Sequence, residues 1–427
     1  MGQLPPCLIR HCSHVKNAPA RDLASLAGEP SLFAASAAAK LERLQAGLAP
    51  LAGRYDAVVA NPPYMGAKNM NAWLGGWVKK RYPDVKGDLF SCFMVRNSRM
   101  GAEHAQLGFM TPYVWMFIGT YEKLREFVVK KNTITSLTQL EYSGFSGATV
   151  PICAFTLQKG LCPGYKGGYI RLSDFVGADQ QGPRALQALA DPDCGWFYRA
   201  DARGFGVIPG SPIAYWVGQG MLSAFRNGES IVGFSDYTGS QNKTGDNNRF
   251  LRMCWEVSTS GIGRNKTWAF YSKGGDFRRW YGNLNCVVRT RQDDFDFYAH
   301  NPGSNLLMKK YWFEPGITYT MLTSGKPNFR SYPNIGGFDM AGPTICGLGQ
   351  RQDWCLAFLN TSIAASMLDA INPTLNLQVK DIKALPFIFE EGRTSRVNEI
   401  VDCNVSFSRS DWDDQETSWD FKRNPLV

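Results

Sequence analysis

The chain has 427 residues, of which 44% are hydrophobic and 19% charged, which excludes a disordered protein and allows two or three folded domains. No apolar run approaches the ~18 residues of a membrane span. The first residues, MGQLPPCLIRHCSH, lack the basic-then-apolar order of a signal peptide. We therefore expect a cytoplasmic protein that does not contact a membrane. The 11 cysteines show no CxxC pair and only four histidines are present, so we expect free thiols and no metal site.

The net charge of +9 is unevenly distributed along the chain. Residues 243–330 contain 14 Lys and Arg against 7 Asp and Glu, a local excess of 14 − 7 = +7. A basic segment interleaved with aromatic residues is typical of a surface that binds a polyanion. A solvated basic surface has the same composition, and charge alone does not separate the two.

The predicted elements of the N-terminal half alternate between strands and helices. Residues 1–50 are poorly specified, with one Ala-rich helical stretch. After them, strands are predicted from alternation and β-branching, and helices from apolar spacing. The predicted order is strand 55–60, helix 85–103, strand 107–115 breaking at Pro112, helix 119–131, strand 134–142 and strand 151–160. This order predicts an α/β fold with a mostly parallel sheet.

The texture of the sequence changes near residue 165. Beyond it, Gly, Asp, Pro and Arg punctuate short strands, and helices are sparse until the apolar run 353–371. An acidic tail, SRSDWDDQETSWDF, follows. We divide the chain into segments 1–50, 51–165, 166–345 and 346–427.

The stretch 55-YDAVVANPPYMG-66 places an amide, two prolines and an aromatic ring directly after a strand. Ligands of doubly wound folds bind beyond the carboxyl ends of strands, and Pro62 and Pro63 keep this backbone rigid. The Asn61 side chain and the Pro62 carbonyl are then two fixed acceptors for the N–H groups of a planar amine, whose lone pair they free for attack. Tyr64 offers a ring face to the heterocycle that carries this amine. Asn-Pro-Pro also forms ordinary turns, but the Tyr and the preceding strand favour a site.

YDAVVANPPY resembles the motif of amino-group methyltransferases, which act on N6 of adenine, N4 of cytosine or the amide of glutamine. Later blocks, among them YTGSQNKTGDNNRFLRMCWEV, WAFYSKGGDFRRWYGN and FLNTSIAASMLDAINPTLNLQVKDIKALPF, resemble the adenine-specific DNA methyltransferases of phage-growth-limitation and BREX defence systems. The resemblance covers about residues 50–425. It implies N6-adenine methylation of double-stranded DNA in phage defence or restriction-modification. Asn at position 61 agrees with adenine, because Ser is common there in cytosine N4 enzymes.

The resemblance also implies a fold and a set of site residues. Segment 51–165 would be the C-terminal half of a Rossmann-like methyltransferase domain, and 166–345 a mixed α+β target recognition domain. The segment from Asp88, the turn at Pro112 and the ring of Phe145 would line the target-base pocket, although Phe145 is equally well read as a core residue. An enzyme that acts on a base within a duplex must flip it out and hold the flanking DNA. Candidate DNA contacts are Lys243, Thr244, Asn247, Arg249, Lys273, Arg278 and Arg279; for each of them an ordinary surface position is the alternative.

The chain departs from this family where the methyl donor, S-adenosylmethionine, should bind. The donor pocket needs a Gly-rich turn after a first strand and an acid at the end of the second, and only 60 residues precede Asn61. They contain no strand followed by GxG. We therefore expect the donor site to be largely absent, the apolar edge of the sheet to be exposed, and the chain to need a missing N-terminal half or other defence-system proteins as partners.

Two other functions remain open. The chain could be a non-catalytic DNA-binding remnant or specificity module of such a system. It could also be a methyltransferase for RNA or for protein glutamine, but such an enzyme would not need a large basic recognition region. The target sequence, the oligomeric state and the presence of a nuclease cannot be read from these residues.

Overall fold

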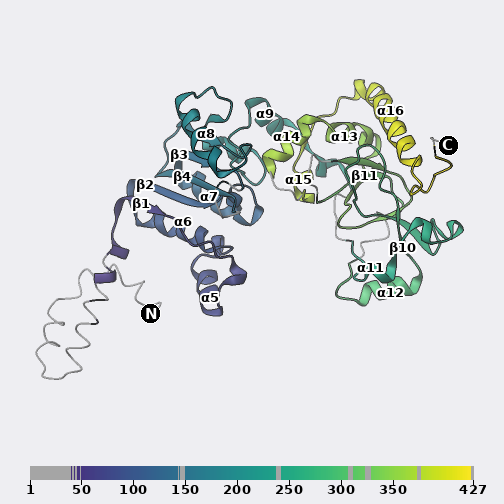
Figure 1. Ribbon diagram of the computed structural model, residues 1–427, viewed down its shortest axis with the longest axis horizontal. Coiled ribbons are helices and arrows are strands. Elements are labelled where there is room, and N and C mark those ends of the chain that lie inside the picture. The colour runs from purple at the N-terminus through teal and green to yellow at the C-terminus, as the bar shows by residue number, and fades with distance from the viewer. Residues whose placement is uncertain are drawn as a thin grey trace, which may run out of the picture. The chain divides into compact units, whose positions relative to one another are not determined.

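The computed structural model describes residues 40, 43, 46–48, 50–142, 144, 150–236, 242–305, 311–322, 328–372 and 377–424 (Figure 1). They belong to two compact units, of which the first extends to Gly204 and the second begins at Phe205. No single helix in these ranges is long and apolar enough to cross a membrane; one sharply bent pair, Gly349–Leu359 with Ser362–Ile371, passes the same test only when taken together.

The first unit is built on one six-stranded sheet with the strand order β1-β2-β4-β3-β5-β6. Its strands are β1 (Tyr55–Ala60), β2 (Gly101–Pro112), β3 (Asn132–Gln139), β4 (Ile152–Lys159), β5 (Gly167–Arg171) and β6 (Phe197–Ala200). Its helices are α5 (Ala72–Arg81), α6 (Leu89–Met100), α7 (Glu122–Lys131) and α8 (Ala178–Ala190). The α/β class and the predicted strands and helices between residues 55 and 160 are confirmed, while most of the predicted segment 1–50 lies outside the described residues.

The sheet is mixed, where a mostly parallel one was expected. β1 pairs with β2 and β3 pairs with β5 in parallel, whereas β4 runs antiparallel to both β2 and β3, and β6 antiparallel to β5. The connection from β3 to β4, residues 140–151, lies partly outside the described ranges. In the strand order β4 lies between β2 and β3.

The core of the first unit lies between this sheet and its helices. Phe109 and Phe155, from adjacent strands, have ring centroids 5.4 Å apart, and the fully buried Trp115 lies 5.2 Å from Phe155. β1 differs from the other strands because, among the described residues, it pairs only with β2. The side chain of Val59 in β1 is 82% exposed. Val59 is therefore an exposed apolar residue on the outermost strand of the described sheet.

The second unit contains three small sheets, with orders β13-β9-β10-β8, β12-β11-β14 and β15-β7. Its strands are β7 (Glu229–Ser230), β8 (Leu251–Met253), β9 (Trp268–Ser272), β10 (Cys286–Arg289), β11 (Gly316–Tyr319), β12 (Phe329–Tyr332), β13 (Gly336–Phe338), β14 (Thr344–Cys346) and β15 (Pro386–Phe387). Its helices are α9 (Gln219–Asn227), α10 (Ile231–Phe234), α11 (Asn247–Phe250), α12 (Gln292–His300), α13 (Gln352–Leu359), α14 (Ser362–Ile371), α15 (Val379–Lys383) and α16 (Thr394–Asp413). The mixed α+β character expected for this region agrees with these elements.

Two features of the second half differ from the prediction. The helix expected over 353–371 is two helices, α13 and α14, bent by 82°. The break has a local cause: the Asn360 amide exchanges hydrogen bonds with the backbone of Phe329, and the Thr361 hydroxyl accepts from Ala364 N to cap α14. Helices are also less sparse than expected, since α8 and α16 were not predicted. Gly182 and Pro183 lie within α8, and their low helix propensity argues against a helix there.

The sheet of the first unit continues past residue 165, where the sequence placed a boundary. β5 pairs in parallel with β3, and β6 adds to β5, so residues 167–200 complete the same sheet. The second unit in turn extends from Phe205 to the C-terminus, across the weaker boundary drawn near residue 345.

Candidate functional site

The NPPY residues lie at the carboxyl edge of the first sheet. Asn61 follows the last residue of β1, and Ala60 is in register with Phe109 of β2, so the carboxyl ends of both strands lie side by side. β4 begins at the same edge, with Ile152 opposite Pro112. Backbone groups of three strand ends therefore surround the segment that follows β1.

Within this segment the side chains differ in exposure. Pro62 is buried and anchors the turn, while Asn61 and Tyr64 are exposed. The Tyr64 hydroxyl lies 3.1 Å from Asn61 Oδ1 and 3.3 Å from the Met110 carbonyl oxygen. A hydroxyl has one proton, so it donates to one of these acceptors at a time. No described donor bonds to the Pro62 carbonyl oxygen.

Burial controls the protonation of this edge. It raises the pKa of the Tyr64 hydroxyl, with a smaller contribution from the Cys153 thiol, whose own pKa burial raises to about 12. Both groups are therefore neutral near pH 7. Tyr64 keeps its proton and remains a hydrogen-bond donor.

Asp88 connects the NPPY segment to helix α6. One of its oxygens, Oδ1, accepts from Phe90 N at 3.3 Å, which caps α6, and from Met65 N at 2.9 Å, one residue after NPPY. Leu89 N also donates to the Met65 carbonyl at 3.0 Å. The structure thus gives Asp88 a positioning contact: its carboxylate fixes the backbone that carries Tyr64.

Of the two remaining residues expected in the pocket, the structure describes Pro112 and does not describe Phe145. Pro112 ends β2 and is buried, and Tyr113 N after it donates to the Pro151 carbonyl at 2.7 Å, which ties this turn to the start of β4. Phe145 lies outside the described residues. Phe90 of α6 was not predicted from the sequence as a site residue. Its ring is fully buried and meets that of Tyr64 edge-on, with the ring centroids 6.5 Å apart.

The predicted DNA loop of the second unit is held by its own polar groups. Lys243 and Asn305 exchange backbone hydrogen bonds of 2.8 and 2.9 Å, and Ser304 Oγ donates to the Thr244 carbonyl at 2.6 Å. Thr244 is fully buried and its hydroxyl donates to Asn247 Oδ1 at 2.9 Å, so its side chain organises the loop from within. The side chains of Lys243, Asn247 and Arg249 are exposed.

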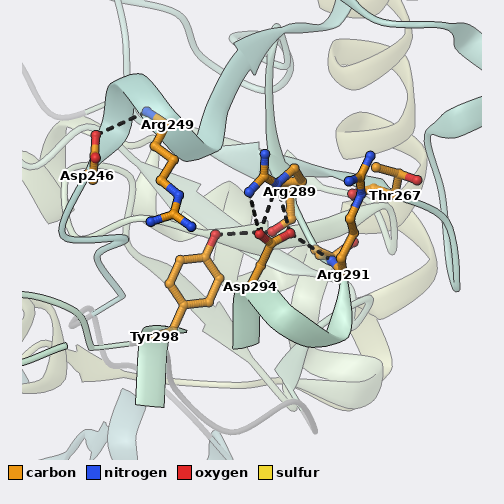
Figure 2. Close-up of polar contacts among 8 residues, drawn as sticks. Asp246, Arg249, Thr267, Arg289, Arg291, Asp294 and Tyr298 are labelled. Atoms are coloured by element: carbon orange, nitrogen blue, oxygen red, sulfur yellow. Dashed lines mark hydrogen bonds and ion pairs between the residues drawn. The ribbon is translucent and has the colours of Figure 1, made fainter. Parts of the chain in front are cut away.

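Neighbouring arginines of this unit differ in what surrounds their charge, as Figure 2 shows. Arg289 forms three hydrogen bonds of 2.6 to 2.9 Å with Asp294, which is 1% exposed, and its guanidinium is neutralised there. The Arg249 guanidinium lies 4.6 Å from the ring of Phe297 and 4.9 Å from that of Phe250. No described carboxylate pairs with it. Arg249 is thus available to an external anion and Arg289 is not.

The other candidate cations show the same contrast. Lys273 pairs at 3.1 Å with Asp339, whose side chain is nearly buried, and Arg278 pairs at 2.7 Å with the exposed Asp411. Arg279 lies 5.6 Å from the ring of Phe277, and its buried Nε has no partner among the described residues.

Arg278 and Arg279 line a pocket of about 760 Å³ in the second unit. Trp280, Asn283 and Asn285 also line it, as do Phe407 and Trp412 of α16. Cations, amides and aromatic rings together are the groups that bind phosphates and bases of nucleic acids. The groups of three or more His, Cys, Asp or Glu that could hold a metal ion are absent from the part of the chain that the structure describes.

Comparison with known proteins finds relatives that are similar to this chain. Residues 28–145, which include NPPY, match the model of the Eco57I restriction-modification methylases. The adenine-specific methyltransferase PglX of Lacticaseibacillus casei (strain Zhang) is 32% identical over 401 residues, 88% of this chain and 33% of PglX. BrxX of Escherichia coli O9:H4 (strain HS), also an adenine-specific methyltransferase, is 31% identical over 391 residues, 88% of this chain and 31% of BrxX. The chain is a homologue of these methyltransferases.

This homology confirms the resemblance inferred from NPPY and the later blocks. The chain spans about a third of the length of PglX and BrxX. Its fold is also similar to that of the type IIL restriction-modification enzyme MmeI, solved in complex with DNA, with a TM-score of 0.51, 9% identity, and coverage of 87% of this chain and 51% of MmeI. At that identity the likeness concerns the fold alone.

Proposed function

We propose that this PglX and BrxX homologue carries the target-base site and the DNA recognition region of an adenine-N6 DNA methyltransferase that acts in phage defence. The observation that carries the proposal is the pair of acceptors, Asn61 Oδ1 and the Pro62 carbonyl, at the carboxyl edge of β1. An adenine amine has two N–H donors, and the hydroxyl of the neutral Tyr64 lies 3.1 Å from the first of these acceptors, Asn61 Oδ1.

The shared proton of Tyr64 suggests how the site receives its base. In the free chain the Tyr64 hydroxyl satisfies Asn61 Oδ1 or the Met110 carbonyl. When an amine reaches Asn61, the hydroxyl can donate to Met110 alone, and the amide oxygen is then released without a lost hydrogen bond. Binding both N–H groups favours a pyramidal nitrogen with an accessible lone pair, so the attack needs no strong base.

S-adenosylmethionine would supply the methyl group. The described residues fit the acceptor base and do not fit this donor, because none of their strands is followed by a Gly-rich turn and a second strand ending in an acid. Among the described residues β1 pairs only with β2, so further strands would add at its other side. We therefore place the donor pocket outside the described part of this chain, either in residues upstream or in a separate partner.

The test has two stages. Calorimetric titration of S-adenosylmethionine into this chain is expected to show no saturable binding. Fusion to the upstream part of PglX is then expected to restore donor binding and N6-adenine methylation of unmethylated DNA, measured by mass spectrometry of the digested DNA. A fusion that binds both donor and DNA and leaves adenine unmethylated would favour the alternative, a specificity module without catalysis.

A further inference from the structure

Residues 67–87 form an excursion whose two ends meet at the NPPY segment. Gly66 and Asp88 form an antiparallel bridge, and Ala67 N donates to the Gly87 carbonyl at 3.0 Å. The chain therefore leaves the candidate site and returns to it. Between these ends lies α5, which extends beyond α6 in the first unit (Figure 1).

Helix α5 contributes little to the core. Val78 is its one buried residue, and Gly75 and Gly76 in its middle weaken its intrinsic helicity. A helix kept only for stability would bury an apolar stripe. α5 instead presents most of its side chains to solvent, which indicates a surface role.

An aromatic stack runs across this helix and ends in solvent. The Arg99 guanidinium lies 5.6 Å from the ring of Tyr82, the Tyr82 ring 5.6 Å from Trp77, and Trp77 stacks on Trp73 at 6.5 Å with 9° between the planes. Tyr82 is buried and Trp73 is 50% exposed. The inner members hold the outer indole rigidly, so Trp73 can stack with little loss of conformational entropy.

The excursion also carries unpaired cations, two of which share this face. The excursion has five basic residues, Lys68, Lys79, Lys80, Arg81 and Lys86, against Asp84 alone, so 5 − 1 = +4. All five are exposed, and no ion pair within the described residues includes any of them. Arg81 lies one helical step of four from Trp77 and Lys80 one step of three, so both share the face of the stack. On α7, by contrast, Lys123 and Lys130 both pair with Glu126, at 3.3 and 3.9 Å.

We propose that this face of α5, formed by Trp73, Trp77, Lys80 and Arg81, binds the DNA duplex next to the target adenine. The inference rests on the proposed function, because the base must lie at Asn61 for the excursion to meet the flanking DNA. Lys80 and Arg81 neutralise backbone phosphates, and Trp73 stacks on a sugar or on a base exposed by flipping. Since the contacts are to backbone and ring faces, they add affinity without fixing the target sequence.

The experiment measures binding of this chain to a short DNA duplex as a function of salt concentration. For Lys80→Ala/Arg81→Ala we expect the slope of log K against log salt to fall by about 1.8, since each lost phosphate contact removes about 0.9. Trp73→Ala is expected to weaken binding by about tenfold at fixed salt, and Trp73→Phe to retain most of the affinity. The matched control, Lys123→Ala/Lys130→Ala, removes the same charge from paired positions and should leave the slope unchanged.

The outcomes separate the two proposals. Tight, salt-dependent binding by the unaltered chain, with unchanged slope and affinity in the α5 variants, overturns the role of α5 and leaves the proposed function standing. If the unaltered chain does not bind the duplex, both proposals fail for this chain. A loss seen with an RNA duplex and absent with DNA overturns the DNA assignment in favour of RNA. Thermal unfolding of each variant verifies that these exposed substitutions leave the fold intact.

Discussion

The NPPY edge and the basic residues of the second unit differ in how the fold brings their functional groups together. At the edge, four consecutive residues follow one strand, and the sheet brings fixed backbone groups of β2 and β4 to them. In the second unit the cations come from separate elements, and Arg249 of α11 and Arg289 of β10 differ in whether a buried carboxylate neutralises them. A contiguous motif can thus predict the chemistry of a site from the sequence. A count of basic residues cannot separate a DNA contact from an internal ion pair.

The largest effect is expected from Asn61→Ala in the fusion with the upstream part of PglX (the completed enzyme). It removes one of two amine acceptors, and loss of a preorganised polar contact of this kind lowers turnover by up to about 10³-fold. DNA affinity should be unchanged, because Asn61 meets only the flipped base. The readout is single-turnover methylation beside duplex binding, with the exposed Asn227→Ala as control. Normal methylation in Asn61→Ala would remove the role given to this amide.

Next in size is the effect of Arg289→Ala on stability. The substitution leaves the Asp294 carboxylate, 1% exposed, without its charge partner, which costs about 3 kcal/mol in the free energy of unfolding. The double variant Arg289→Met/Asp294→Leu should recover much of this loss. Urea unfolding measures both. A stable Arg289→Ala protein with weakened DNA binding would place Arg289 among the DNA contacts and contradict the comparison.

Asp88→Ala tests whether the edge depends on one carboxylate. It removes the cap of α6 and the tie to Met65, so we expect a loss of about 1–2 kcal/mol in unfolding free energy. Methylation should fall in the completed enzyme, since Tyr64 loses its backbone support. Asp88→Asn keeps an acceptor oxygen and serves as the conservative control. Equal losses in the two variants would mean that the negative charge, and not the hydrogen bonds, matters.

Arg249→Ala should have the smallest effect, confined to DNA binding. Its guanidinium rests on aromatic rings without an acid, so its removal should lower the salt slope by about 0.9 and leave stability nearly unchanged. Arg409→Ala, which breaks pairs with Asp413 and Asp420, is the control that should not change the slope. An unchanged salt slope in Arg249→Ala would show that Arg249 is an ordinary surface residue and does not contact DNA.

The sequence predicted the elements that local patterns determine. The strand before Asn61, the helix after Asp88 and the break at Pro112 all follow from residue periodicity and proline chemistry. It did not predict the antiparallel insertion of β4, the split of the helix at Asn360 or the burial of Thr244. Each of these depends on a partner distant in the chain: β2, the Phe329 backbone and Ser304, respectively.

The closed base of the 67–87 excursion has a consequence for engineering. Because Gly66 and Asp88 are bridged directly, the exposed positions between them can change while the attachment points and the buried Val78, Tyr82 and Val85 stay in place. Exchange of this segment among homologues is therefore a route to variants with altered tolerance of salt or of flanking DNA. The geometry of Asn61 and Tyr64 should remain unchanged in these variants, because both residues lie outside the exchanged segment.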